Sequence, residues 1–156
     1  MTKGMTILYK VHNNLYVNLT NRCTCSCTFC LRNEKETVGE SSTLWLEHEP
    51  SVEEVKKEFE KFNMDEYNEV VFCGFGEPTE RIDDLIEIAK FVKEKTNGMD
   101  IVYGGGLKQD NAEMLASIDE IDGGLIALTR FQGEIGYYPE EYLEIIRLYM
   151  GRENNK

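Results

Sequence analysis

The chain has 156 residues, which fits a single domain over 1–156 and excludes a complete eight-unit (βα) barrel, since that needs about 250 residues. A hydrophobic content of 41% with 10% aromatic residues indicates a folded protein, and the net charge of −12 argues against general nucleic-acid binding. No apolar stretch approaches the roughly 18 residues of a membrane helix, and the first residues do not have the pattern of a signal peptide. We therefore expect a cytoplasmic protein with no membrane association.

The first third of the chain predicts paired strands followed by a cysteine-rich loop. Residues 5–11 and 15–20 alternate apolar and polar positions around turn residues at 12–14, which is typical of a hairpin. Four cysteines fall within residues 23–30, directly after the second strand. A polar loop follows, over residues 32–48.

The rest of the chain predicts three further strands, each followed by a helix. A capping-box pattern after Pro50 begins a helix that extends to about residue 63. Together with the second strand this makes about four βα units, so we expect an α/β fold, a truncated and open partial barrel around a parallel sheet. The later elements are predicted as strand 69–73, a helix ending at Asn97-Gly98, strand 100–103, a short helix with an N-cap signature from Asp110, strand 125–128 and helix 139–150.

Four sequence features that could bind a ligand or a metal follow predicted strands. They are the cysteine run, the loop 74–79, the glycines 104–106 and the segment 129–130. Ligands of parallel sheets bind at the carboxyl ends of the strands, so the order of these features predicts one functional rim.

The cysteine run carries the strongest chemical signal. Cys23, Cys27 and Cys30 have the spacing Cys-x3-Cys-x2-Cys, and three thiolates can bind three irons of a [4Fe–4S] cluster while the fourth iron stays open. A zinc-binding module that also uses Cys25 is an alternative, although zinc sites usually take ligands from two separated pairs. A four-thiolate electron carrier with Cys25 or Cys73 as the fourth ligand is another.

The cysteine run and the later Gly74-Phe75-Gly76-Glu77-Pro78 resemble the cluster loop and the glycine-rich loop of the radical S-adenosylmethionine (SAM) superfamily. Residues 15–30, 44–47 and 71–79 also resemble small radical SAM proteins associated with TatD-type nucleases. The chain length is similar to that of anaerobic ribonucleotide reductase activases. After residue 98 the similarity weakens, and about four βα units stand where the superfamily usually has six.

The resemblance implies a radical SAM enzyme, in the broad sense an oxidoreductase. It implies a [4Fe–4S] cluster on Cys23, Cys27 and Cys30, with SAM at the open iron. An electron from an external donor would then cleave SAM to methionine and a 5′-deoxyadenosyl radical, which abstracts hydrogen from a substrate. The residues expected to contact or brace SAM are Phe29 at the adenine, Gly74, Phe75, Gly76 and Glu77 in the glycine-rich loop, and Lys108 and Arg130 at the rim.

A sheet that ends after four units leaves an edge strand exposed, which is a liability in water. We expect a protein partner, or a second copy in a homodimer, to cover this edge. Activation of a glycyl-radical protein would suit such an arrangement, whereas a covered pocket would favour a small substrate.

Overall fold

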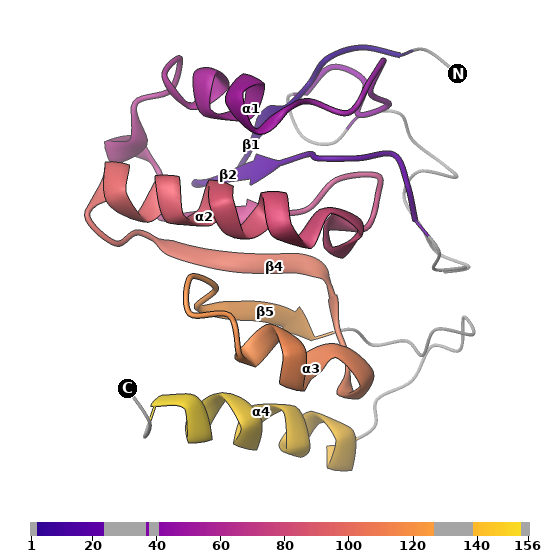
Figure 1. Cartoon of the computed structure of the whole chain (residues 1–156), viewed down its shortest axis with the longest axis vertical. Coiled ribbons are helices and arrows are strands. Elements are labelled where there is room, and N and C mark those ends of the chain that lie inside the picture. The colour runs from indigo at the N-terminus through magenta and orange to yellow at the C-terminus, as the bar shows by residue number, and fades with distance from the viewer. Residues whose placement is uncertain (1–2, 24–36, 38–40, 127–138, 154–156) are drawn as a thin grey trace.

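The computed structural model of the protein describes residues 3–23, 37, 41–126 and 139–153. Its strands form one sheet in the order β1-β2-β3-β4-β5 (Figure 1). β1 and β2 pair antiparallel as the predicted hairpin, and β2 to β5 pair parallel in sequence order. The strands are β1 (Leu8–Val11), β2 (Asn14–Val17), β3 (Glu69–Phe72), β4 (Asp100–Leu107) and β5 (Gly123–Ile126).

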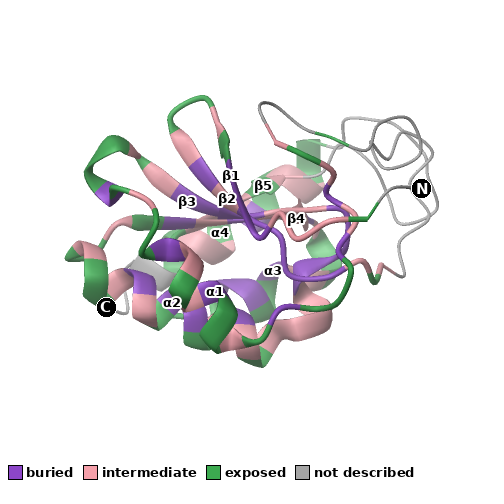
Figure 2. Cartoon of the chain, turned by 90° about the horizontal axis from the view of Figure 1, so that it is seen from above, coloured by how far each residue is buried: buried purple, intermediate pink, exposed green. Residues whose placement is uncertain are grey.

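Helices α1, α2 and α3 connect the parallel strands and lie on one face of the sheet (Figure 2). The last helix, α4, packs against α3. Within the described residues the sheet is open, so the predicted α/β partial barrel is confirmed. The helices are α1 (Val52–Phe59), α2 (Ile82–Thr96), α3 (Gln109–Ala116) and α4 (Pro139–Glu153), and the 3-10 segments are η2 (Met64–Glu66) and η3 (Pro78–Arg81).

Local sequence signals explain where α1 and α2 begin and end. The hydroxyl of Ser51 accepts from the Glu54 N–H at 3.1 Å, and the Glu54 carboxylate accepts from the Ser51 N–H at 2.7 Å, which completes the predicted capping box. α2 ends at Thr96, and the left-handed φ of 57° at its C-cap, Asn97, closes the helix as the Asn-Gly pair predicts. α1 ends at Phe59, before the predicted residue 63, because the chain turns there with hydrogen bonds three residues apart.

Alternating strand residues pack two hydrophobic clusters on opposite faces of the sheet. Leu15 and Val17 belong to the main core under the helices, whereas Tyr16 faces the other way. The smaller cluster on that other face consists of Tyr9, Leu44 and Phe75, with Val11, Tyr16 and Trp45 against it. It lies next to the ends of β2 and β3 and therefore next to the predicted rim.

Two further local predictions were wrong. Residues 104–106 are not an exit loop, because β4 continues through them to Leu107 with an irregular register against β5. Asp110 does not cap α3, since the side chain of Asn111 accepts from the Lys108 N–H at 2.8 Å and takes that role. In the part of the chain that the structure describes, no helix is both long enough and apolar enough to cross a membrane.

Candidate functional site

The loops that leave β2 and β3 are joined by a backbone hydrogen bond. The Glu77 N–H donates to the Arg22 carbonyl at 2.7 Å, although 55 residues separate the two positions in sequence. Parallel strands bring their carboxyl ends to the same edge, and β2 and β3 are neighbours in the sheet. The partly buried Cys23, directly after Arg22, therefore starts the cysteine run beside the glycine-rich loop.

Close backbone approach explains the glycines of that loop. A Cβ on Gly76 would lie 2.1 Å from the Thr20 carbonyl oxygen and 2.7 Å from that of Arg22. A Cβ on Gly74 would lie 2.1 Å from Oδ1 of Asn18, whose side chain is fully buried. Both contacts are far shorter than carbon and oxygen tolerate, so only glycine lets the two exits lie this close.

The Asn18 side chain leaves one acceptor unused beside Gly74. Its Nδ2 donates to the carbonyls of Thr6 at 3.1 Å and Leu44 at 2.9 Å, which fixes the orientation of the amide. Its Oδ1 has no hydrogen-bond partner among the described residues, although it is buried. A spare acceptor therefore lies under the first glycine of the loop.

The Glu77 carboxylate holds the loop to the next strand of the sheet. Its Oε1 accepts from the Tyr103 hydroxyl at 2.5 Å, and from the backbone N–H and hydroxyl of Thr79 at 3.1 and 2.9 Å. Glu77 is 9% exposed, and a Cβ on Gly105 would meet both its carboxylate and the Tyr103 hydroxyl within 2.8 Å. The carboxylate is thus directed into the protein and braces the loop.

Phe75 packs against the aromatic cluster on the face away from the helices. Its ring meets Trp45 edge-on at 5.0 Å between centroids, and the side chain is 5% exposed. Beside it, the Tyr9 hydroxyl donates to the Cys73 carbonyl at 2.7 Å. Burial first, and then the proximity of Cys73 and Tyr16, raise the pKa of Tyr9. Any ligand contact from Phe75 would have to come from its backbone.

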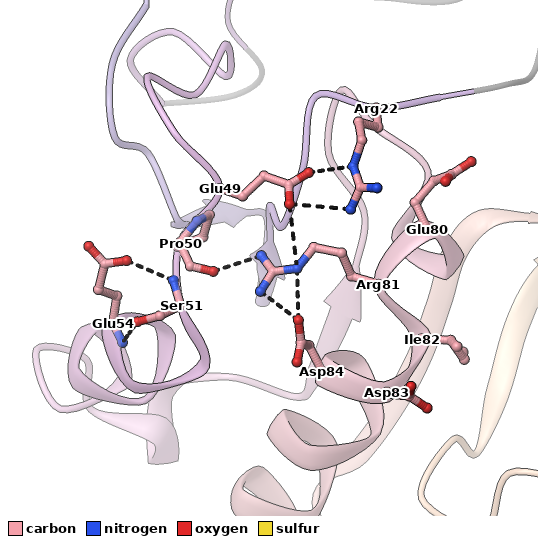
Figure 3. Close-up of a pocket in the computed structure, with 10 residues that line it drawn as sticks. All are labelled: Arg22, Glu49, Pro50, Ser51, Glu54, Glu80, Arg81, Ile82, Asp83 and Asp84. Carbon is pink, nitrogen blue, oxygen red and sulfur yellow. Dashed lines mark hydrogen bonds and ion pairs between the residues drawn. The ribbon is translucent and has the colours of Figure 1, made fainter.

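A polar cavity of about 470 Å³ opens beside the end of β2, between the starts of α1 and α2 (Figure 3). On one wall, the Arg22 guanidinium makes a bidentate ion pair with the Glu49 carboxylate. Nε donates to Oε1 at 2.6 Å, and Nη2 donates to Oε2 at 3.2 Å. On the other wall, the Arg81 guanidinium bonds to Oδ2 of Asp84 at 2.8 and 3.0 Å. The ten residues that line it include two arginines and five acids, so the cavity carries an excess of negative charge.

Glu49 is kept ionised by its neighbours. Burial opposes ionisation, but the hydrogen bonds from Thr20 and Arg22, with the charges of Arg22 and Arg81, together lower the pKa of its carboxyl. The carboxylate is therefore a fixed negative group next to the start of the cysteine run.

The structure brings together some of the predicted site residues and leaves others outside its description. Cys23 and residues 74–77 meet at one rim, while Lys108 stands at the start of α3 after β4. Cys27, Cys30, Phe29 and Arg130 lie outside the described residues. Within the described ranges, no three histidine, cysteine or acidic side chains are grouped as for a metal ion, and of the three proposed ligands only Cys23 falls there.

Sequence reasoning did not single out the residues that hold the end of β2. The Asn21 amide pairs with the backbone of Leu46, donating to its carbonyl at 2.8 Å and accepting from its N–H at 2.9 Å. Thr20 and Arg22 are held by Glu49, in the same segment as Leu46. The only sequence feature that pointed to these contacts was the polar run Thr20-Asn21-Arg22 before the first cysteine. Polar side chains directly after a largely apolar strand need hydrogen-bond partners.

The family comparison agrees with this geometry. The family model of the radical SAM superfamily matches residues 17–152, which is most of the chain. No curated protein matches the chain. The fold is an open α/β sheet. Its first parallel strand leads into the cysteine run, and its second leads into the glycine-rich loop. These features define the class of protein. The chain belongs to the radical SAM superfamily and is a radical SAM enzyme.

The family generally uses a [4Fe–4S] cluster and SAM. The donor set fits this pair, because the Cys-x3-Cys-x2-Cys spacing suits a cluster with one open iron. The fourth thiol of the run, Cys25, does not supply the second, separated cysteine pair that zinc sites usually use. The buried Oδ1 of Asn18 leaves one hydrogen-bond acceptor without a described partner beside Gly74.

Proposed function

We propose that the chain binds a [4Fe–4S] cluster through Cys23, Cys27 and Cys30, binds SAM along residues 74–77, and acts on a protein partner. The observation that carries the proposal is the 2.7 Å hydrogen bond from Glu77 to Arg22, which joins the start of the cysteine run to the glycine-rich loop. When bound, such a cluster supplies the electron that cleaves SAM into methionine and a radical able to abstract hydrogen.

The described residues would serve this chemistry by positioning. Glu77, bonded to Tyr103 and Thr79, fixes the loop against β4, and the loop glycines keep the two exits in contact. No acid or base is needed for hydrogen abstraction by a radical, so the buried carboxylate of Glu77 has a structural task.

The open sheet supports a protein as the substrate. Among the described residues β5 pairs with β4 alone, and Leu125 on β5 is 52% exposed. A strand edge with an apolar side chain is a surface that another polypeptide can cover. A partner that presents a backbone segment, as a glycyl-radical protein does, would suit this edge.

The test of the cofactor is anaerobic reconstitution with iron and sulfide, addition of SAM and a strong reductant, and quantification of 5′-deoxyadenosine. We expect the product from the wild-type protein and none from Cys27→Ala. A bound cluster without product would favour an electron carrier, and tight zinc without a cluster would indicate a zinc module. Either result would overturn the proposal.

The test of the substrate class divides a cell extract by size. We expect the high-molecular-weight fraction to increase 5′-deoxyadenosine formation and the low-molecular-weight filtrate to leave it unchanged. An increase with the filtrate alone would assign a small-molecule substrate instead.

A further inference from the structure

The backbone just before the first cysteine is held by two hydrogen bonds. The Arg22 N–H donates to Oγ1 of Thr20 at 3.0 Å, and the Arg22 carbonyl accepts from the Glu77 N–H at 2.7 Å. Both the backbone N–H and the backbone carbonyl of Arg22 are therefore hydrogen-bonded. The direction in which the chain continues to Cys23 depends on these two bonds.

Glu49 connects the side chains that surround this backbone. Its Oε1 accepts from the Thr20 hydroxyl at 2.6 Å and from Nε of Arg22 at 2.6 Å, while Oε2 accepts from Nη2 of Arg22 at 3.2 Å. Because the Thr20 hydroxyl gives its proton to Glu49, its oxygen lone pairs face the Arg22 N–H. One carboxylate thus orients both the side chain and the backbone at position 22.

Glu49 stands on a segment that is itself fixed. The next residue, Pro50, accepts from Nη1 of Arg81 at 2.7 Å, and the same nitrogen donates to the Leu19 carbonyl at 2.9 Å. The Arg81 side chain is only 8% exposed, so these bonds are shielded from water. Ser51 then caps α1, which ties the segment to that helix (Figure 3).

We propose that Glu49 is a positioning residue for the iron–sulfur cluster, fixing through Thr20 and Arg22 the place at which Cys23 enters the site. This inference rests on the proposed function, because it takes Cys23 as a cluster ligand. Glu49 does not touch the cluster in this role; it acts through the backbone of the residue before the ligand.

The expected effect is local. The side chains of Arg22 and Glu49 are 56% and 38% exposed, and ion pairs at such exposure contribute little to the free energy of folding. Loss of the pair should leave the fold intact while the end of β2 becomes less well fixed. Global stability is consequently the wrong measurement, and the local backbone and the cluster are the right ones.

The experiment compares Glu49→Gln with Glu47→Gln. Both remove one negative charge from the same segment, and Glu47 is exposed with its backbone N–H on the Gly4 carbonyl. In the cluster-free protein, we expect E49Q to speed deuterium uptake in residues 18–23 and E47Q to leave it unchanged. In the reconstituted protein, we expect E49Q to lose its visible absorbance to a chelator about two- to fivefold faster, the range that an exposed ion pair gives.

Two further readouts separate positioning from a general structural effect. The electron paramagnetic resonance signal of the reduced cluster, recorded with and without SAM, should change in E49Q and not in E47Q. In an Arg22→Gln background, Glu49→Gln should have a smaller effect than in the wild type, because part of its action passes through that arginine.

The outcomes distinguish the two levels of the hypothesis. If the wild type holds a SAM-responsive cluster and E49Q matches E47Q in all readouts, the positioning role of Glu49 is wrong and the proposed function stands. If the wild type holds no cluster, or one that ignores SAM, the proposed function is wrong and the role of Glu49 falls with it.

Discussion

Gly76 is the residue at which the site tolerates the least change. Its missing side chain lets two strand exits meet, and the atoms that a Cβ would approach are backbone carbonyl oxygens, which cannot rotate away. The same requirement at Gly74 involves a side-chain amide that is held by two hydrogen bonds. The most sensitive position is therefore set by backbone packing.

Gly76→Ala should destabilise the protein by about 2 kcal/mol or more, because the loop must move away from Thr20 and Arg22. It should also reduce 5′-deoxyadenosine formation by a larger factor than its effect on folding explains. Urea unfolding of the cluster-free protein and the product assay measure the two effects. Gly123→Ala is the control, since no atom lies within 4 Å of its Cβ position. Equal behaviour of the two variants would contradict the packing described here.

Tyr103→Phe tests the brace on Glu77. The variant removes one of three donors to a buried carboxylate oxygen, so we expect a loss of about 1–2 kcal/mol in the free energy of unfolding. Tyr67→Phe is the comparison, because its ring contact with Phe62 does not depend on the hydroxyl. A Tyr103→Phe protein as stable as the wild type would show that the hydroxyl does not support the loop.

At the scale of the elements, the start of α1 matters because it carries the segment that holds the end of β2. Its capping box joins Ser51 and Glu54 in both directions, and His48 adds a contact to Glu54 at 3.1 Å. The Ser51 backbone N–H first, and then His48, hold the pKa of the Glu54 carboxyl below its ordinary value of 4.5. The capping box is therefore a source of pH-dependent stability.

A group whose pKa is lower in the folded than in the unfolded state stabilises the fold above the unfolded pKa and loses that effect as pH falls through the folded pKa. We therefore expect the wild-type protein to lose stability below about pH 4.5 more steeply than Glu54→Gln does. Urea unfolding of the cluster-free chain at a series of pH values measures the slopes. A slope for Glu54→Gln as steep as the wild type's would contradict the prediction.

Elements determined by neighbouring residues could be predicted from the sequence, whereas those determined by long-range contacts could not. The hairpin, the strand predicted at 69–73 and the cap of α1 were predicted because alternation, apolar runs and capping pairs are properties of neighbouring residues. Residues 104–106 were misassigned because glycine has little intrinsic preference for a strand, and the Tyr103–Glu77 contact that occupies the space at Gly105 is distant in sequence. Glu49 and Arg81 had the pattern of ordinary surface charges, since nothing near them shows that both hold the end of β2.

At the scale of the whole molecule, the two edges of the described sheet differ, because β1 pairs antiparallel and β5 pairs parallel. Its first parallel strand is covered by the β1 hairpin, whereas β5 has no further described neighbour. Met114, Leu125, Leu143 and Met150 are the exposed large apolar side chains of the described residues. In the part of the chain that the structure describes, β1 and β5 are therefore the two edge strands of the sheet.

We expect the isolated protein to self-associate weakly at high concentration, because β5 has no second neighbour in the sheet among the described residues and can pair with another copy when no partner covers it. Leu125→Lys should reduce this association, since a lysine on an edge strand opposes pairing. Sedimentation velocity over a range of concentrations measures it. Met150→Lys, at an exposed position of α4, is the matched control. A chain that stays monomeric throughout, with or without Leu125→Lys, would mean that this edge needs no cover.

The hydrogen bond between Glu77 and Arg22 also has a consequence for the order of events during synthesis. The start of the cysteine run leaves the ribosome early. The residues that hold it in position by hydrogen bonds are made later; they are Glu49, Glu77 and Arg81. Cys23, the first of the proposed ligands, therefore gains its final setting only after the chain has been made through the start of α2 and β3 has docked beside β2. Iron and sulfide would then reach the site only after that docking. Pulsed hydrogen exchange during refolding would show whether the Glu77 amide, which donates to the Arg22 carbonyl, is protected only once β3 is.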